Sequence, residues 1–138
     1  MSGSRARILL VDDFAPWREY VRSLLAQRQD LLIEAEASDG LEAVEKAKET
    51  RPDLILLDIG LPKLNGIKVL KQILTMSPAT KIILLTQETP DGFMHEGIRL
   101  GAMGYVPKTS AAKDLLKAID TVLGGSYFGI SIVEDEEE

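Results

Sequence analysis

RILLVDDF, residues 7–14, decides the fold, because four apolar residues in it are followed by two adjacent carboxylates. The apolar run, residues 8–11, has the length of a strand and contains no polar residue, as is typical of a strand buried on both faces of a sheet. Asp12 and Asp13 stand where this strand ends. The stretch therefore predicts a buried parallel strand whose carboxyl end carries two acids.

Short apolar runs alternate with segments of helical periodicity along the chain. After the first run come Trp17, Val21, Leu24 and Leu25, at the i, i+4, i+7, i+8 spacing of one face of a helix. Further strands are predicted at residues 31–37, 53–58, 81–86 and 104–106. The helices that follow them are predicted around residues 41–47, 67–74, 91–100 and 115–123, with Ser38 or Asp39 as a cap and Gly124-Gly125 as a stop.

Five such strand–helix pairs indicate an α/β fold, a doubly wound five-stranded parallel sheet covered by helices on both faces. Right-handed crossovers and the usual strand order, 2-1-3-4-5, place a site outside the carboxyl ends of strands 1, 3, 4 and 5. At or just beyond those ends stand Asp12, Asp13, Asp58, Thr86 and Lys108. We therefore expect these side chains to lie close together.

The composition is that of one globular domain: 138 residues, 45% hydrophobic and 28% charged. We expect a domain over residues 6–125, a disordered N-terminus over 1–5 and an acidic tail over 126–138. The net charge of −6 argues against direct binding of nucleic acid, which depends on clustered Lys and Arg. No apolar run approaches the roughly 18 residues that span a bilayer, and no secretory signal is recognised, so we expect no membrane association and a cytoplasmic location.

Three carboxylates at one edge of a sheet repel one another. Two charges about 4 Å apart repel by roughly 4 kcal/mol at an effective dielectric of about 20. The cluster of Asp12, Asp13 and Asp58 must protonate or bind a cation, and Lys108 supplies only one positive charge. With no cysteine in the chain, the hard oxygen ligands favour Mg²⁺. A carboxylate there could then attack a phosphoryl group and form an aspartyl phosphate.

These residues resemble the receiver (CheY-like) domain of two-component response regulators, over residues 6 to about 125. The resemblance rests on Asp12-Asp13, on Asp58 in LILLDIGLPKLNG, on Thr86 in IILLT, and on Tyr105 and Lys108 in GYVPK. It implies a flavodoxin-like three-layer sandwich. It also implies that Asp58 accepts a phosphoryl group from a phosphohistidine on a sensor histidine kinase or a phosphotransfer protein.

The resemblance also implies a metal site. Mg²⁺ would be held by Asp13, Asp58 and the backbone carbonyl of Gly60, and Asp12 would orient the metal shell from just outside it.

A switch is implied as well. Lys108 would pair with the phosphoryl oxygens, Thr86 would donate its hydroxyl to one of them, and Tyr105 would turn inward when Thr86 moves. The surface that changes would be the fourth helix, fifth strand and fifth helix, roughly residues 91–123, through which a homodimer could form.

Some positions depart from the family pattern. Gln87 follows Thr86 where many receivers have a small residue, so we expect narrower access to the site. Thr109 rather than proline follows Lys108, which leaves the isomer of that peptide bond open, because a cis bond without proline costs roughly 3 kcal/mol. Gly60 and Glu88 stand at variable positions and leave the lifetime of the phosphoryl group open.

Several alternatives stay open. LGGSYFGIS, residues 123–131, is similar to receivers of the LuxR-type branch, in which a helix-turn-helix output domain follows. The chain is then a stand-alone receiver, which its acidic end favours, or a receiver fragment of a DNA-binding transcription regulator. An aspartyl-phosphate phosphatase would carry a second Asp where Gly60 stands. A flavodoxin-like electron carrier would need hydroxyls and N–H groups where DDFAPW offers anions and a proline.

Taken singly, these residues have simpler roles. Asp12 or Asp13 could cap the helix that begins near Ala15, and Lys108 could be a solvated surface lysine. Trp17 falls on the apolar stripe of the first helix, where we expect it to pack. The site hypothesis depends on the coincidence of all its residues at one edge of the sheet.

Overall fold

A five-stranded parallel sheet forms the centre of the molecule. The computed structural model describes residues 5–60, 66–87 and 92–129. Its strands are β1 (Ala6–Val11), β2 (Leu31–Ala37), β3 (Leu54–Asp58), β4 (Lys81–Thr86) and β5 (Gly104–Pro107). They lie in the order β2-β1-β3-β4-β5, and every pairing is parallel, so the predicted sheet is confirmed.

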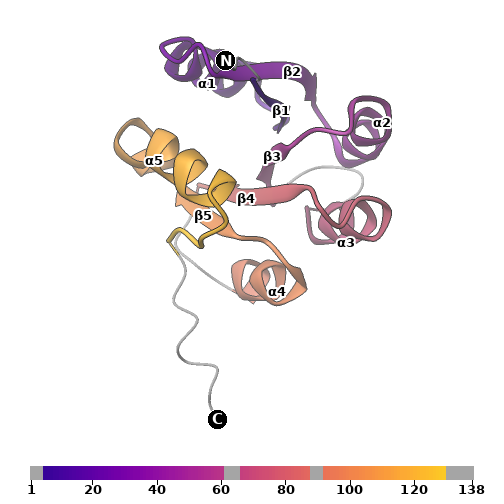
Figure 1. Ribbon diagram of the computed structural model, residues 1–138. Coiled ribbons are helices and arrows are strands. Elements are labelled where there is room, and N and C mark those ends of the chain that lie inside the picture. Colours follow the sequence, from indigo (N-terminus) through magenta and orange to yellow (C-terminus); the bar gives the residue numbers. More distant parts are fainter. Residues whose placement is uncertain (1–4, 61–65, 88–91, 130–138) are drawn as a thin grey trace.

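Helices cover both faces of this sheet (Figure 1). On one face pack α1 (Ala15–Leu25) and α5 (Ala111–Leu123), and on the other pack α2 (Gly40–Thr50), α3 (Gly66–Met76) and α4 (Gly92–Leu100). A short 3-10 turn, η1 (Lys108–Ser110), joins β5 to α5. The three layers are those of the predicted doubly wound fold. None of the helices in the described ranges is long and apolar enough to cross a bilayer.

The strands β1, β3 and β4 send alternate side chains into two separate cores. In β1, Ile8 and Leu10 join the core beneath α1 and α5, whereas Leu9 and Val11 join the core beneath α2 and α3. All four side chains are fully buried. The strand is apolar without alternation because helices cover both of its faces.

The strand β2 has a more polar sequence because it lies at the edge of the sheet and is less completely buried. It pairs only with β1, and its Glu34 side chain is exposed. Glu36 accepts hydrogen bonds from the guanidinium groups of Arg18 and Arg22 on α1. These acids face solvent or arginine rather than the core. The register of β2 against β1 also shifts between Ile8 and Leu9, so the first half of β2 faces one core and the second half faces the other, and residues 31–37 alternate less clearly.

The start of α2 carries a reciprocal cap. Asp39 is the N-cap, and its Oδ1 accepts a hydrogen bond from the Glu42 amide at 2.9 Å. The Glu42 carboxylate in turn accepts one from the Ser38 amide at 2.8 Å. Of the two caps that the sequence predicts, Asp39 is the one the structure uses.

The start of α1 is different, because its N-cap is Phe14 and no side chain caps it. The simpler role of Asp12 or Asp13 as a helix cap is therefore not the observed one. Asp12 Oδ1 instead accepts a hydrogen bond from the Phe14 amide, ahead of the helix, at 2.9 Å. Asp12 is left at the end of β1 with its carboxylate facing the neighbouring strands.

The chain stays ordered past the expected domain end at residue 125. The Phe128 amide donates to the Met103 carbonyl, and the Tyr105 amide donates to the Phe128 carbonyl, both at 3.0 Å. Phe128 thereby forms a parallel bridge with Gly104 and packs against the core beneath α5. Residues 126–128 thus extend the β5 edge of the sheet instead of belonging to a tail.

The other expectations for the termini fall largely outside the described residues. Of the expected disordered N-terminus, residues 1–4 lie outside them, and Arg5 Nε donates to the Gln29 carbonyl. Of the expected acidic tail, residues 130–138 lie outside them, as does Glu88.

Candidate functional site

The carboxyl ends of β1 and β3 bring three acids together. Asp12 and Asp13 follow β1, and Asp58 is the last residue of β3. Carboxylate oxygens of these three residues lie within 4.8 Å of one another. The arrangement exists because β1 and β3 are neighbours in the sheet, so their ends meet at one edge.

Asp12 is fully buried, and both of its carboxylate oxygens are engaged. Oδ1 accepts from the Phe14 amide at 2.9 Å, and Oδ2 accepts from Lys108 Nζ at 2.5 Å. The Asp12 carbonyl also accepts from Arg18 Nη1 at 2.7 Å. The charge of Asp12 is therefore balanced by Lys108, and its position is fixed from three directions.

Asp58 is nearly buried and less completely balanced. Its Oδ1 accepts from the Gly60 amide at 3.0 Å, and its Oδ2 lies 3.7 Å from Lys108 Nζ. Burial raises the pKa of Asp58 above its usual value, and the charges of Asp12 and Asp13 act in the same direction. The Gly60 amide and the Lys108 ammonium only partly offset this rise, so the Asp58 carboxylate gains from a further positive charge.

Asp13 differs from both, because its side chain is exposed. Within the part of the chain that the structure describes, its carboxylate makes no hydrogen bond or ion pair. Asp13 is thus the acid of the cluster whose oxygens are available to an ion that arrives from solvent.

The donor set fits a hard divalent cation. Three carboxylates against one lysine leave two negative charges, and all the donors are oxygens. Asp13 and Asp58 have oxygens available for coordination. Asp12 has both oxygens in hydrogen bonds, which fits a residue that orients the metal shell from outside it.

Thr86 and Tyr105 lie on the strands next to this cluster. Thr86 is the last residue of β4 and pairs with Pro107, so it stands at the same edge of the sheet as Asp58. Tyr105 pairs with Leu84, deeper in the sheet, and its side chain is only 5% exposed. The Tyr105 side chain is therefore buried in this structure.

The positions that depart from the family pattern also border the site. Gln87 is exposed, and Gly60 contacts the Asp58 carboxylate through its amide. A Cβ added at Gly60 would lie 3.7 Å from Asp58 Oδ1, so any side chain there would border the Asp58 carboxylate. The structure contains no cis peptide bond in its described part, so the bond between Lys108 and Thr109 is trans.

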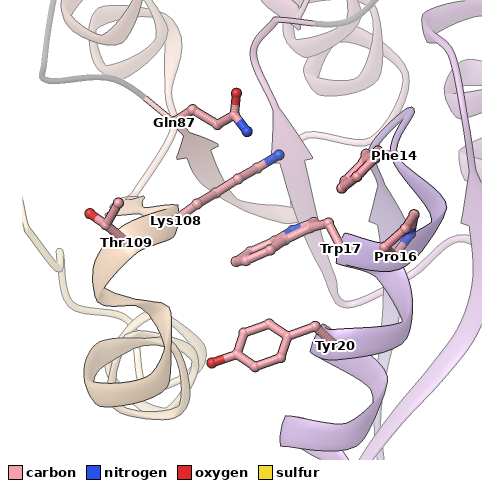
Figure 2. A pocket seen from close by; sticks show the side chains of 7 residues that line it. All are labelled: Phe14, Pro16, Trp17, Tyr20, Gln87, Lys108 and Thr109. Carbon is pink, nitrogen blue, oxygen red and sulfur yellow. The ribbon is translucent and has the colours of Figure 1, made fainter.

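A cavity of about 480 Å³ opens beside the acids, between α1 and the loops that follow β4 and β5 (Figure 2). It is lined by Phe14, Pro16, Trp17, Tyr20, Gln87, Lys108 and Thr109. The sequence predicts only packing for Trp17. The ring does pack against the core, but Lys108 Nζ also lies 5.0 Å from its centroid. The helical spacing of apolar residues could not predict the contact between Lys108 and Trp17, because it identifies Trp17 only as an apolar residue on the buried face of the helix.

The comparisons with known proteins agree with this geometry. The family model of the response regulator receiver domain matches residues 8–120. The crystal structure of a LuxR-family two-component response regulator from Aurantimonas sp. SI85-9A1 is 36% identical, with a TM-score of 0.85, over 91% of this chain and 89% of that one.

Curated relatives match at similar identity. An uncharacterized transcriptional regulatory protein, YxjL of Bacillus subtilis, is 36% identical over 91% of this chain and 57% of its own length. Protein CcdB of the same organism is 37% identical over 86% of this chain and 98% of its own length. The chain spans little more than half the length of the transcriptional regulators that it matches.

Proposed function

This chain belongs to the response regulator receiver domain family, and on that premise we propose that Asp58 is the residue that takes up a phosphoryl group. As a receiver domain of two-component response regulators, the chain acts as a signalling switch. The observation that carries the assignment is the position of Asp58. Its carboxylate lies at the end of a central strand, between Lys108 and two other acids.

The proposed reaction is a phosphoryl transfer. An Asp58 carboxylate oxygen attacks the phosphorus of a phosphohistidine on a sensor histidine kinase or a phosphotransfer protein. The new P–O bond forms as the P–N bond breaks, and the imidazole leaves with that electron pair, neutral because its other nitrogen carries the proton. The product on this chain is an acyl phosphate at Asp58.

We propose that Asp13, Asp58 and the Gly60 carbonyl hold Mg²⁺, with Asp12 orienting the shell. When bound, Mg²⁺ would offset the negative charge of the incoming phosphoryl oxygens. The free carboxylate of Asp13 and the two uncompensated charges of the cluster support this assignment. Asp12 keeps its hydrogen bonds to Phe14 and Lys108 in this role.

Lys108 and Thr86 complete the proposed site. The Lys108 ammonium lies 3.7 Å from Asp58 Oδ2, within reach of a phosphoryl oxygen attached there. Thr86 ends β4 at the same edge and would donate its hydroxyl to another phosphoryl oxygen. Each group would bind the charge that the reaction places on Asp58.

The readout of the switch is also a proposal. Tyr105 would follow Thr86, and the α4, β5 and α5 surface would then change and bind a partner or a second copy of the chain. Relatives both longer than this chain and of nearly its own length match it, so receivers with and without further residues belong to the family. The cytoplasmic location stays a prediction.

The site argues against the two other classes of protein, an aspartyl-phosphate phosphatase and a flavodoxin-like electron carrier. Gly60 stands where a phosphatase of the aspartyl-phosphate type would carry its acid/base Asp, and its amide binds Asp58. The loop after β1 presents Asp12 and Asp13 where a flavodoxin would need donors for a phosphate. We therefore propose a switch that modifies itself and does not turn over a small-molecule substrate.

Intact-mass measurement tests the assignment. The chain is incubated with Mg²⁺ and a small acyl phosphate or phosphoramidate, and we expect one labile phosphoryl adduct. Asp58→Asn should abolish it, whereas Asp114→Asn, which changes an aspartate on the first turn of α5, should keep it. An adduct that persists in Asp58→Asn would show that another residue is the acceptor.

A further inference from the structure

Lys108 occupies an unusual position for a lysine, because its side chain is only 9% exposed. Its ammonium lies 2.5 Å from Asp12 Oδ2, 3.7 Å from Asp58 Oδ2 and 5.0 Å from the centroid of the Trp17 ring. Figure 2 shows its extended side chain running between Gln87 and Trp17. A flexible four-carbon side chain keeps this one position only if its surroundings restrict it.

Trp17 is itself firmly placed. It lies in the first turn of α1, directly after Pro16, and packs against the core beneath α1 and α5. The Tyr20 ring lies beside it, with centroids 5.3 Å apart and planes inclined by 43°. The buried Trp17 Nε1 has no hydrogen-bond partner within the described part of the chain. Ring packing, rather than a hydrogen bond, therefore sets the orientation of the indole.

We propose that Trp17 is a positioning residue for Lys108, and that its indole face holds the ammonium at the acid cluster before a phosphoryl group arrives. This inference rests on the proposed phosphorylation of Asp58. A cation over an indole face is attracted by the ring quadrupole, and the attraction grows when water is excluded, as it is from this lysine.

The benefit to the reaction is preorganisation. Charge that is already in place when the phosphoryl group arrives needs no reorganisation during the transfer. Asp12 holds the ammonium from one side, and the Trp17 ring restricts it from another. Without the ring, the lysine side chain would gain rotamers in which its charge points into the cavity.

Two substitutions of Trp17 distinguish the effect of its aromatic face on the reaction rate from the effect of its packing volume. Trp17→Met removes the ring but keeps a long side chain that fills irregular gaps, and Trp17→Phe keeps a smaller ring. In the full chain, with Mg²⁺ and a small acyl phosphate, we expect Trp17→Met to slow adduct formation roughly 3- to 30-fold. Trp17→Phe should restore part of the rate.

Phe14→Leu is the matched control, because Phe14 binds Asp12 only through its main-chain amide, which the substitution keeps. Phe14 lines the same cavity and is 58% exposed, but within the described ranges only the Trp17 ring lies over Lys108. The rate of this variant should stay close to that of the unmodified chain. Equal slowing by Phe14→Leu and Trp17→Met would mean that cavity shape, rather than the indole face, controls the rate.

A spectroscopic signature tests the contact without any phosphoryl donor. Protons above an aromatic ring are shifted upfield, so the ε-methylene protons of Lys108 should be shifted in the unmodified chain, weakly shifted in Trp17→Phe and unshifted in Trp17→Met. The shifted resonance is assigned to Lys108 by its absence from the spectrum of Lys108→Met. An unshifted Lys108 signal in the unmodified chain would overturn the proposal.

The two proposals fail in distinguishable ways. If the unmodified chain forms no adduct with any donor, the assignment of Asp58 is wrong. If it forms the adduct and Trp17→Met does so at an unchanged rate, only the role of Trp17 is wrong. Should Trp17→Met fail to fold, Trp17→Phe replaces it, and an unchanged rate together with a lost ring-current shift in that variant would equally overturn the role of Trp17.

Discussion

Asp58 is a carboxylate in a place that disfavours its charge. Its pKa is raised chiefly by burial, so the folded chain holds this proton more tightly than the unfolded chain does. Between the unfolded pKa, about 3.9, and the raised folded pKa, stability therefore falls as the pH rises. Above the folded pKa, the fold bears the full free-energy cost of burying the ionised Asp58 carboxylate. Below the unfolded pKa this cost vanishes, because the carboxyl group is protonated in both states.

We therefore expect Asp58→Asn to stabilise the fold at pH 7 in the absence of Mg²⁺, by on the order of 1 kcal/mol, and to lose most of this gain near pH 4. Urea unfolding at both pH values measures the free energy of unfolding. A gain of equal size at both would show that Asn packs better, rather than that a charge has been removed.

We expect Asp13 to add to the stability of the fold only when Mg²⁺ is bound. Mg²⁺ that binds the folded chain alone should raise the free energy of unfolding, by about 2.7 kcal/mol at about 100 times its Kd. Asp13→Asn should remove most of this gain. It should leave the metal-free stability unchanged or slightly raised, since the Asp13 carboxylate has no hydrogen-bond or ion-pair partner among the described residues and its charge repels that of Asp58. Thermal unfolding with and without Mg²⁺ measures both effects.

The control for Asp13 is Asp114→Asn, which changes an aspartate of α5 that is not one of the three clustered acids. It should respond to Mg²⁺ as the unmodified chain does. An Asp13→Asn chain that still gains its full stabilisation would place the ion elsewhere.

At the scale of single elements, the start of α2 depends on one side chain. Asp39→Ala removes the hydrogen bond from the Glu42 amide to Asp39 Oδ1 and leaves that amide without its cap. We expect a loss of about 1 kcal/mol in the free energy of unfolding, measured with urea. Glu45→Ala, at an exposed position of the same helix, should change it little. Equal losses from both would argue against the cap.

The edge of β5 depends on a glycine. Gly129 has a φ of +73°, and a Cβ there would lie 2.3 Å from the Tyr105 carbonyl oxygen. Gly129→Ala should push residues 126–129 off the strand, so that the Tyr105 amide loses its bond to Phe128 and exchanges its hydrogen faster. Amide hydrogen exchange measured residue by residue reports this.

Gly125→Ala separates the clash from backbone strain. Gly125 also has a positive φ, +96°, but nothing lies within 4 Å of a Cβ built on it. It should therefore leave the exchange of the Tyr105 amide near its original rate. Faster exchange in both variants would mean that backbone strain ahead of residues 126–128, rather than contact between Gly129 and β5, controls the exchange of the Tyr105 amide.

For the whole molecule, what could be predicted from the sequence follows from the two-sided burial of the sheet. Solid apolar runs in β1, β3 and β4 identify strands covered by helices, and their ends then bring Asp12, Asp13 and Asp58 to one edge. The known strand order of doubly wound folds completes the placement, without any knowledge of side-chain geometry.

What could not be predicted depends on such geometry. Lys108 lies closer to Asp12 than to Asp58, and its ammonium lies over the Trp17 ring. The paths of η1 and of the first turn of α1 bring these groups together. The attachment of Phe128 to β5 could not be predicted because a single backbone bridge leaves no periodic pattern. Charge and hydropathy describe residues one at a time, whereas these contacts join residues distant in sequence.

The bridge at Phe128 also has a mechanical meaning. Gly129 lies against the Tyr105 carbonyl, so a pull applied to the chain at Gly129 reaches β5 before it reaches α5. Two main-chain hydrogen bonds would bear this load first, one of them donated by the Tyr105 amide. Tension applied at Gly129 would therefore reach Tyr105 while both hydrophobic cores were still intact.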